Sequence, residues 1–334
     1  MYYEEPYRKR QRGPRQREDR SRRRKRSFGG VLAWLLFRLL ALALVLILLC
    51  AGILYALPVS LFAVEPEGAE LSLTEGLPQS RANILLLGLD ALRESRQRSD
   101  TVMIASIGYG ALELTSVMRD TLVDIPGYGV GKLNAAYAHG GPELVMRSLN
   151  EAFDLNLMHY VAVDFASLVA VVDALGGVEV TVTEQEASLI NQTMDGDRHK
   201  FEPLGYSAPA LTQSGERTHL NGVQALYFAR IRKLDSDFQR TRRQRALLTA
   251  MLSKLKSSLW NPVVLVRLGK ALIRAIDTNM SIVELLSLGE KALLAGAPDT
   301  HRLPVDDSFT DDGSSLRIDD RQKNIDAFRA YAYE

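Results

Sequence analysis

Residues 228–245 contain an unusual density of guanidinium groups for a chain that is nearly neutral overall. From Arg230 to Arg245 there are seven Lys or Arg side chains and two Asp, whereas the whole chain of 334 residues has a formal net charge of +1. Arginine binds phosphate through paired N–H donors. Three interpretations are open: contact with a nucleic-acid backbone, binding of a small phosphorylated ligand, and a solvated helix face.

The basic cluster divides when it is placed on helices. Arg230 and Arg232 end one helix, and Asp237 begins another, where its charge suits the helix dipole. On that second helix Asp237, Arg240 and Gln244 share one face, because their spacing is i, i+3 and i+7. We expect three arginines to converge on one anion: Arg230, Arg232 and Arg240. Arg243 lies near the same helix face, whereas Arg242 and Arg245 point elsewhere and are expected to be solvated.

Two acids and one arginine stand at predicted strand ends. Asp90 ends the apolar run "NILLLGLD", Asp100 precedes the run "TVMIASI", and Arg119 follows "LELTSVM". Carboxylates at such ends are suitable Mg²⁺ ligands, since Mg²⁺ takes one or two carboxylates together with phosphate oxygens. Each acid could equally cap a turn, and Arg119 could form a structural ion pair. If the strands are neighbours, all three residues lie at one edge of a sheet, where ligands collect in open α/β folds.

The distribution of charge argues against nucleic acid as the ligand. Residues 1–30 have a net charge of +8, and the part of the chain after residue 57 sums to −8. A DNA-binding domain normally has a broad basic surface, because phosphate neutralisation supplies most of its affinity. The basic cluster is a local island in an acidic domain, which favours a compact anionic ligand.

An uncharged segment follows the basic N-terminus. Residues 39–57 form nineteen consecutive residues without a charge, about the length that a helix needs to cross the bilayer core. We expect an uncleaved single-pass anchor with the N-terminus in the cytoplasm and the rest outside; the alternative is a cleaved signal peptide. The predicted organisation has four parts: a disordered basic segment (1–30), a transmembrane helix (31–57), a stalk (58–80) and an extracellular domain (81–334).

The extracellular part alternates apolar strand patterns with helical patterns, which predicts an α/β fold. Residues 184–218 are polar and Gly-containing and are predicted to form an irregular surface insertion. The chain beyond residue 221 is predicted to be largely helical, with helices at 221–231, 238–257, 262–276 and 281–296. Cys50 is the only cysteine, which excludes an intrachain disulfide and a thiolate metal site. Motifs for nucleotide hydrolysis, serine esterases and zinc proteases do not occur.

Several stretches together resemble the LytR-CpsA-Psr family. They are, in order, "NILLLGLD", "RSDTVMIASI", "VMRDTLVDIPGYGVGKLNAAYAHGGPELV", "VDFASLVAVVDALGGVEV", "HLNGVQALYFARIR" and "DFQRTRRQ". The resemblance implies a three-layer α/β/α sandwich with a mixed central sheet and an apolar groove for a polyprenyl tail. It also implies a Mg²⁺-dependent phosphotransferase, with Mn²⁺ as the alternative ion, that moves a glycopolymer such as teichoic acid or capsule from polyprenyl pyrophosphate onto peptidoglycan.

The resemblance assigns roles to individual residues. The metal-binding acids fall on Asp90 and Asp100. The residues that grip the pyrophosphate fall on one set of side chains: Arg98, Arg119, Lys132, Arg230, Arg232, Arg240 and Gln244. The acceptor hydroxyl needs a general base, for which Asp237 is the first candidate and Asp100 the second.

Three other functions compete with this assignment. A hydrolase that releases polyprenyl phosphate differs from the transferase only in using water as the acceptor. A transcriptional regulator would use the basic segment at 8–26, although membrane orientation and anionic lipid explain that segment better. A non-catalytic lipid- or glycan-binding module would be expected to lack some of the acids and arginines, and all of them are present here.

Overall fold

The computed structural model describes residues 49, 70–90, 99–201, 208–231 and 237–333. The chain divides into two units, Met1–Cys50 and Ala51–Glu334, and all the strands and the helices α2 to α9 belong to the second. Within the described residues, no helix combines the length and the hydrophobicity needed to span a bilayer. The described residues include none of the predicted basic tail, only Leu49 of the predicted membrane helix, and only the last part of the predicted stalk. These three assignments stay predictions.

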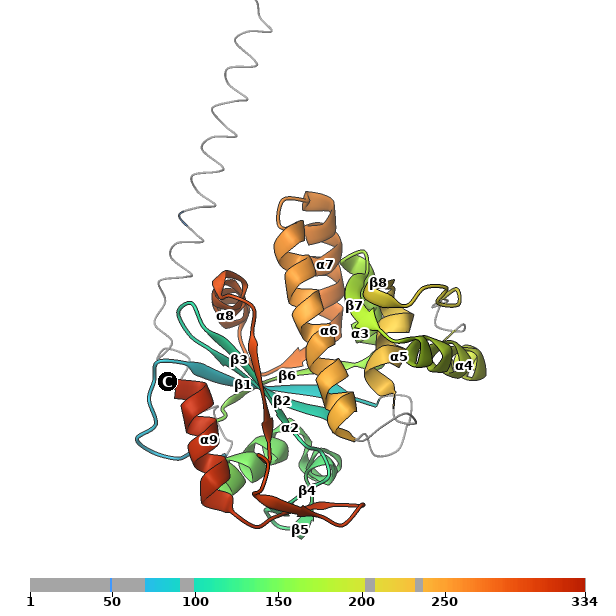
Figure 1. Ribbon diagram of the computed structural model, residues 1–334. Helices are drawn as coiled ribbons and strands as arrows, with labels where there is room; N and C mark the ends of the chain where they lie inside the picture. Colours follow the sequence, from blue (N-terminus) through green and yellow to red (C-terminus); the bar gives the residue numbers. More distant parts are fainter. Residues whose placement is uncertain (1–48, 50–69, 91–98, 202–207, 232–236, 334) are drawn as a thin grey trace, which may run out of the picture. The chain divides into compact units, whose positions relative to one another are not determined.

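A six-stranded mixed sheet forms the centre of the second unit (Figure 1). Its strand order is β10-β3-β2-β1-β6-β9. The bounds are Ala82–Leu89 for β1, Ser99–Ile107 for β2, Leu112–Val117 for β3, His159–Asp164 for β6, Ile276–Thr278 for β9 and Asp299–Leu303 for β10. β1 pairs with β6, and β3 with β10, in parallel, and the other neighbours are antiparallel. The predicted strands at 83–90, 101–107 and 112–118 are therefore confirmed.

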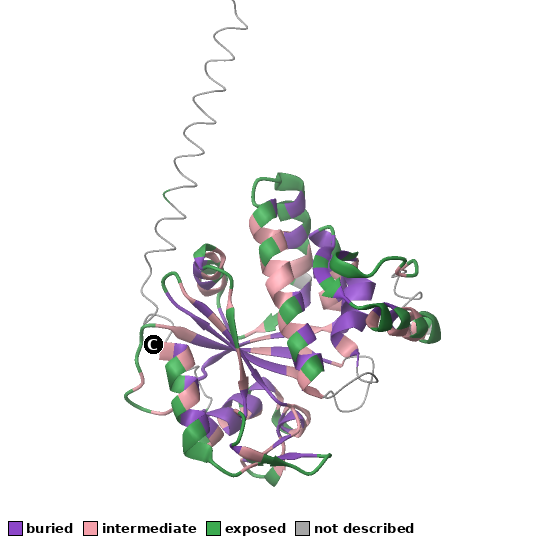
Figure 2. Cartoon of the chain, in the orientation of Figure 1, coloured by how far each residue is buried: buried purple, intermediate pink, exposed green. Residues whose placement is uncertain are grey.

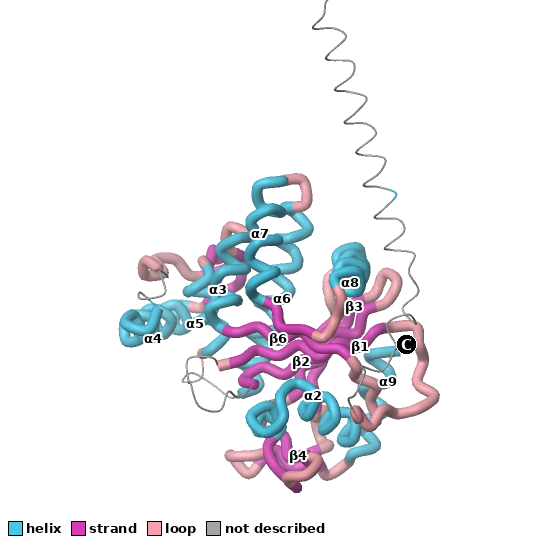
Figure 3. Tube along the Cα trace, turned by 180° about the vertical axis from the view of Figure 1, so that it is seen from behind, coloured by secondary structure: helices cyan, strands magenta, loops and turns pink. Residues whose placement is uncertain are grey.

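Helices cover both faces of this sheet, which gives the three layers that the family resemblance implied (Figures 1 and 3). Side chains alternate along β1, so Leu85 and Leu87 pack on α2 (Leu133–Phe153) and α9 (Arg321–Tyr333). Ile84 faces the other way, toward α8 (Ile282–Leu294). This two-residue period buries both faces of the strand. Figure 2 shows the resulting buried centre between exposed outer helix faces.

A second apolar cluster forms around helices α3, α4 and α5 and the two-stranded sheet of β7 and β8. The bounds are Phe165–Ala174 for α3, Val178–Val182 for β7, Glu184–Phe201 for α4, Gly215–Leu220 for β8 and Gly222–Arg230 for α5. The prediction of an irregular insertion over 184–218 is wrong. Its first half is helix α4, which buries Ala187 and Ile190 in this cluster.

Two long helices complete this side of the molecule. α6 spans Asp237–Ser258 and α7 spans Pro262–Ala275, in agreement with the predicted helices. α7 begins at an N-cap, Asn261, whose side chain accepts hydrogen bonds from two backbone N–H groups; such caps satisfy donors that the first turn leaves free.

A small second sheet lies below the first in Figure 1, with strand order β11-β12-β4-β5. Its strands are β4 (Thr121–Ile125), β5 (Gly129–Lys132), β11 (Phe309–Asp311) and β12 (Leu316–Ile318). Gly127 in the turn between β4 and β5 and Gly129 at the start of β5 both have positive φ, a conformation that glycine adopts without strain. This explains the glycines of "IPGYG" as turn chemistry.

Candidate active site

Three strand ends meet at one edge of the central sheet. Residue pairing places Leu89 of β1 opposite Ser99 of β2, and Val102 of β2 opposite Val117 of β3. Asp90, Asp100 and Arg119 each lie within two or three residues of these pairs. The sequence prediction that they share an edge is confirmed for Asp100 and Arg119, which form an ion pair of 2.6 Å between Oδ1 and Nη1.

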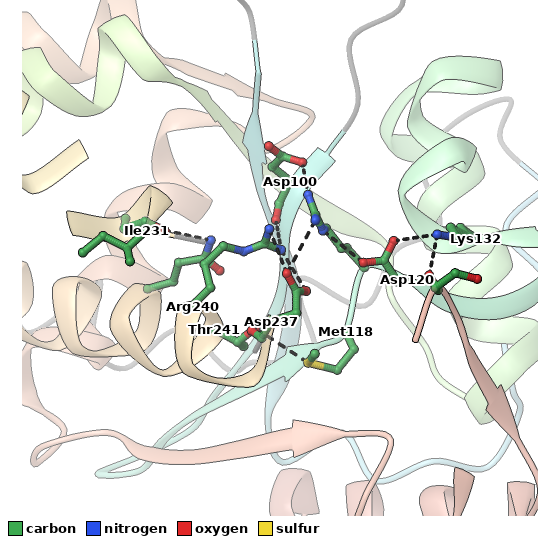
Figure 4. A network of polar contacts seen from close by, with 12 residues as sticks. Asp100, Met118, Asp120, Lys132, Ile231, Asp237, Arg240 and Thr241 are labelled. Carbon is green, nitrogen blue, oxygen red and sulfur yellow. Dashed lines mark hydrogen bonds and ion pairs between the residues drawn. The ribbon is translucent and has the colours of Figure 1, made fainter. Parts of the chain in front are cut away.

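Arg119 is held by three carboxylates (Figure 4). Besides Asp100, its Nε lies 3.3 Å from Asp120 Oδ2 and its Nη2 lies 3.5 Å from Asp237 Oδ1. The three acids come from β2, from the turn before β4 and from the first residue of α6, so this one guanidinium connects three elements. Such a network fixes the plane of the guanidinium before any ligand binds.

The start of α6 brings a second arginine to the same place. Arg240 is 3% exposed and makes two contacts with Asp237, with Nη1–Oδ1 and Nη2–Oδ2 distances of 2.9 and 3.0 Å. Its Nη2 also donates to the backbone oxygen of Asp100 at 3.3 Å. Asp237 therefore lies between two guanidinium groups, as the i, i+3 spacing on α6 predicted for Arg240.

Arg230 ends helix α5, and the sequence motif "NGVQ" at the other end of that helix fixes its position. Asn221 and Gln224 form a capping box in which each side chain accepts from the other's backbone N–H, a known way to set a helix start. Gly222 lies so close to α3 that an added Cβ would meet Val169 O at 2.3 Å. The "NGVQ" motif therefore fixes α5 by capping and packing. Arg230 is positioned at the other end of the same helix.

Asp90 and Arg230 face each other at the edge of the site. Their Oδ2 and Nη2 atoms are 3.9 Å apart, and the Arg230 guanidinium lies over the Phe165 ring at 4.3 Å. Among the described residues, Asp90 Oδ1 and Arg230 Nη1 are buried without a hydrogen-bond partner. Buried polar atoms normally have partners, so this pair is suited to a ligand that carries both a cation and an anion.

The acids fit a hard divalent cation in their chemistry. Asp90 contributes the partnerless carboxylate oxygen and Asp100 a second carboxylate, which is the protein share that Mg²⁺ takes when phosphate oxygens complete its shell. The described residues contain no group of three His, Cys, Asp or Glu side chains placed to hold a metal alone.

An apolar cavity of about 250 Å³ opens from this site into the protein. Its charged and polar lining includes Asp100, Arg230, Arg240 and Gln244. The rest of its wall is mostly aliphatic and comes from β1, β2, β6, α3, α5, α6 and the end of α7, including Leu86, Val163, Leu168, Leu226, Leu247, Met251 and Leu272. The cavity suits a ligand with an anionic head and a hydrocarbon tail.

Two other predicted site residues lie at the borders of the network and the cavity. Lys132 contacts Asp120 Oδ1 at 3.3 Å and donates to Ser314 O, so it reaches the network through Asp120. Gln244 lines the cavity and donates to Ala229 O at 3.5 Å. Two predicted phosphate-binding residues, Arg98 and Arg232, lie outside the described residues.

The prediction that Arg245 is a solvated surface charge is wrong. Its Nη1 donates to Ser116 Oγ at 3.1 Å and to His301 O at 3.3 Å, and burial, followed by the nearby charges of Arg302 and Arg242, lowers its pKa. The matching prediction for Arg242 is confirmed, because that side chain is exposed. Helix spacing correctly placed Arg242 and Arg245 on a different face from Arg240. It did not show that β3 and β10 cover Arg245.

Sequence reasoning missed two contributors to the site. Asp120 bridges Arg119 and Lys132, and its only signal was its position directly after Arg119 in "RDT". Phe165 supports the Arg230 guanidinium. Its only signal was its position directly after β6 in "VDF". Neither residue carries a spacing pattern that indicates its role.

Arginines and acids lie at one edge of the central sheet of this α/β protein, beside an apolar cavity. The chain belongs to the LytR_cpsA_psr family, whose model matches residues 64–329.

Relatives and solved structures agree with this membership. The chain is 30% identical to "Regulatory protein MsrR" of Staphylococcus aureus (strain COL), over 71% of this chain and 70% of that one. It is 36% identical to "Polyisoprenyl-teichoic acid--peptidoglycan teichoic acid transferase TagU" of Oceanobacillus iheyensis, over 52% of each chain. The fold is similar to that of "TagT bound to LIIa-WTA", with a TM-score of 0.59 and 24% identity over 80% of this chain and 96% of that one.

Proposed function

We propose that the chain is a membrane-anchored phosphotransferase that moves a glycopolymer from a polyprenyl pyrophosphate carrier onto a hydroxyl of peptidoglycan. The observation that carries the proposal is the union of two features in one site. Arg119 and Arg240 form a pair of guanidinium groups held in place by carboxylates, and the aliphatic cavity begins at Arg240. A polyprenyl pyrophosphate has the same two parts, a charged head and a hydrocarbon tail.

The names of the relatives support the substrate class. TagU of Oceanobacillus iheyensis and TagT of Bacillus subtilis are both named as polyisoprenyl-teichoic acid–peptidoglycan teichoic acid transferases. The arginines, the acids and the aliphatic cavity recognise the carrier rather than the glycopolymer, so the proposal extends to the class of reaction and to the carrier lipid.

The proposed reaction is a displacement at phosphorus. The acceptor hydroxyl oxygen attacks the phosphorus that carries the glycopolymer, a new P–O bond forms, and the P–O bond to polyprenyl phosphate breaks. The hydroxyl proton passes to a carboxylate, for which we assign Asp237, with Asp100 as the alternative. Negative charge accumulates on the departing polyprenyl phosphate, and Arg119, Arg230 and Arg240 are positioned to stabilise it.

Asp90 and Asp100 would hold the Mg²⁺, with Mn²⁺ as the alternative ion, that the family resemblance implies. Such an ion supplies Lewis-acid stabilisation of the phosphate oxygens. The chain's own residues orient the head group: Arg230 is held flat over Phe165 at 4.3 Å, and Arg119 is fixed by its three carboxylates. Preorganised charges of this kind act without rearrangement during the reaction.

The test uses the purified full chain in lipid vesicles, a polyprenyl-pyrophosphate-linked glycopolymer and peptidoglycan fragments. We expect release of polyprenyl phosphate together with a phosphodiester-linked product. Arg119→Ala should abolish both, whereas Arg242→Ala, which changes an exposed arginine, should leave both unchanged. Full activity of Arg119→Ala would refute the proposal.

A hydrolase uses the same site with water as the acceptor, so the same assay separates the two functions. Release of polyprenyl phosphate at equal rates with and without peptidoglycan fragments, with no linked product, would assign hydrolysis. Formation of the linked product only when the fragments are present would assign transfer.

A further inference from the structure

Helix α7 and the turn before it expose a row of large apolar side chains. We define the α7 outer face by five of them: Leu259, Trp260, Val263, Val266 and Ile273. Trp260 is 94% exposed at the α6–α7 turn, and Ile273 is 86% exposed near the other end of α7. Contiguous exposed apolar surface of this kind marks an interaction site in soluble domains.

The opposite side of α7 is apolar as well. Val264, Leu268 and Ala275 are buried against α3, and Leu272 lines the apolar cavity. α7 is therefore apolar on its inner side and exposes both apolar and basic side chains on its outer side. In the part of the chain that the structure describes, the protein covers only the inner side.

The charge around this face narrows the choice of partner. Residues 238–276 contain no Asp or Glu, although the chain after residue 57 is acidic overall. Arg267 and Lys270 are exposed on α7 itself, between Val266 and Ile273. A two-fold dimer through this face would bring the same basic residues together, which disfavours a second copy as the occupant.

We propose that the α7 outer face docks on an anionic lipid bilayer, with Trp260 at the level of the headgroups. An interfacial helix combines an apolar face with Lys or Arg, tryptophan favours the boundary between hydrocarbon and water, and basic residues are attracted to anionic lipid. Leu272 and Met251 line the cavity from α7 and α6, so docking brings the wall of the cavity to the bilayer. The inference rests on surface composition and holds whichever reaction the site performs.

The test uses tryptophan fluorescence in the full chain. The chain has two tryptophans, Trp34 and Trp260, so Trp34→Phe leaves Trp260 as the sole reporter. The protein is reconstituted in vesicles of phosphatidylcholine and phosphatidylglycerol in equal amounts, with or without bromine on the acyl chains. We expect brominated lipid to remove most of the Trp260 emission and vesicles to shift that emission to shorter wavelength.

A matched reporter controls for chance collisions with lipid. Val130 of β5 is 76% exposed, and the β4–β5 region lies at the opposite end of the second unit from α7 in Figures 1 and 3. Val130→Trp, made together with Trp34→Phe and Trp260→Phe, should keep its emission in brominated vesicles. Equal quenching of both reporters, or of neither, would overturn the proposal.

A triple variant tests the outer face itself. Val263→Ser, Val266→Ser and Ile273→Ser change only exposed side chains, so the fold is expected to survive, as a thermal melt can verify. In the Trp34→Phe background this variant should lose the bromine quenching of Trp260. Quenching that persists in the folded triple variant would refute docking through α7. A blue shift of Trp260 without bromine quenching would also overturn the proposal, because the only other protein present is a second copy of the chain.

Discussion

Two arginines three residues apart on α6 illustrate how the same side chain serves opposite purposes. Arg240 and Arg243 are 3% and 6% exposed, and both are paired with an acid. Arg240 contacts Asp237 at the mouth of the cavity, whereas Arg243 contacts Glu186 of α4 at 3.1 Å and donates to Ile231 O at 3.1 Å. Burial and charge therefore do not identify the functional arginine, and the elements that surround each one do.

The difference follows from the faces of α6. Arg240, Gln244, Leu247 and Met251 line the apolar cavity at intervals of three or four residues, which is one helix face. Arg243 does not line the cavity and joins α6 to α4 through Glu186. One arginine is placed at a ligand cavity, and the other fastens two helices together.

The largest expected effect on activity is that of Arg240→Met. Arg240 is a preorganised positive charge that stabilises the negative charge developing on the phosphate. Removing such a charge lowers turnover by about 10²–10³-fold. The free energy of unfolding should change less than in Arg243→Met, because Asp237 keeps Arg119 at 3.5 Å. Steady-state release of polyprenyl phosphate and urea unfolding measure the two quantities, and wild-type turnover in Arg240→Met would contradict the comparison.

Arg243→Met is expected to show the reverse. Breaking a buried ion pair by removing one partner costs about 3–5 kcal/mol, here because Glu186 would lose its partner. The double variant Arg243→Met, Glu186→Leu should recover much of that loss, since it leaves no unpaired charge. At temperatures where each variant is folded, turnover should be close to wild type; a selective loss of turnover in Arg243→Met would place it in the active site after all.

The smallest effect belongs to Arg242→Gln. This exposed side chain lies between the other two in sequence, and surface substitutions of this kind change the free energy of unfolding by about 0.5 kcal/mol or less. Turnover should also stay within the error of wild type. A clear loss of either quantity would show that basic charge along α6 matters as a whole rather than residue by residue.

The sequence predicted the strands β1, β2 and β3 and the helices α5 to α8 because their patterns are unambiguous, but it missed the strands β9 to β12 and helix α9 in the part predicted to be largely helical. The run 84–89 is wholly apolar, which is typical of a strand buried on both faces, and α5 and α8 begin at capping boxes. Helix α4 escaped prediction because it buries only a narrow stripe, with Ala187 and Ile190 on it. A polar surface helix of that kind resembles a loop in composition.

The sequence predicted the part of the site that belongs to one regular element. Asp237, Arg240 and Gln244 belong to one helix, so their spacing shows that they share a face. The environment of Arg245 depends on Ser116 and His301, which are far away in sequence. Local periodicity carries no information about which strand packs over a side chain, so Arg245 was assigned to solvent.

The central claim is that one ligand places its phosphates at the arginine network and its tail in the cavity behind Arg240. A crystal structure of the protein with a short prenyl pyrophosphate and Mg²⁺ tests it most directly. The account predicts phosphate oxygens on Arg119 and Arg240 and prenyl carbons against Leu247 and Met251. A pyrophosphate bound instead beside Arg242, with the aliphatic cavity empty, would contradict it.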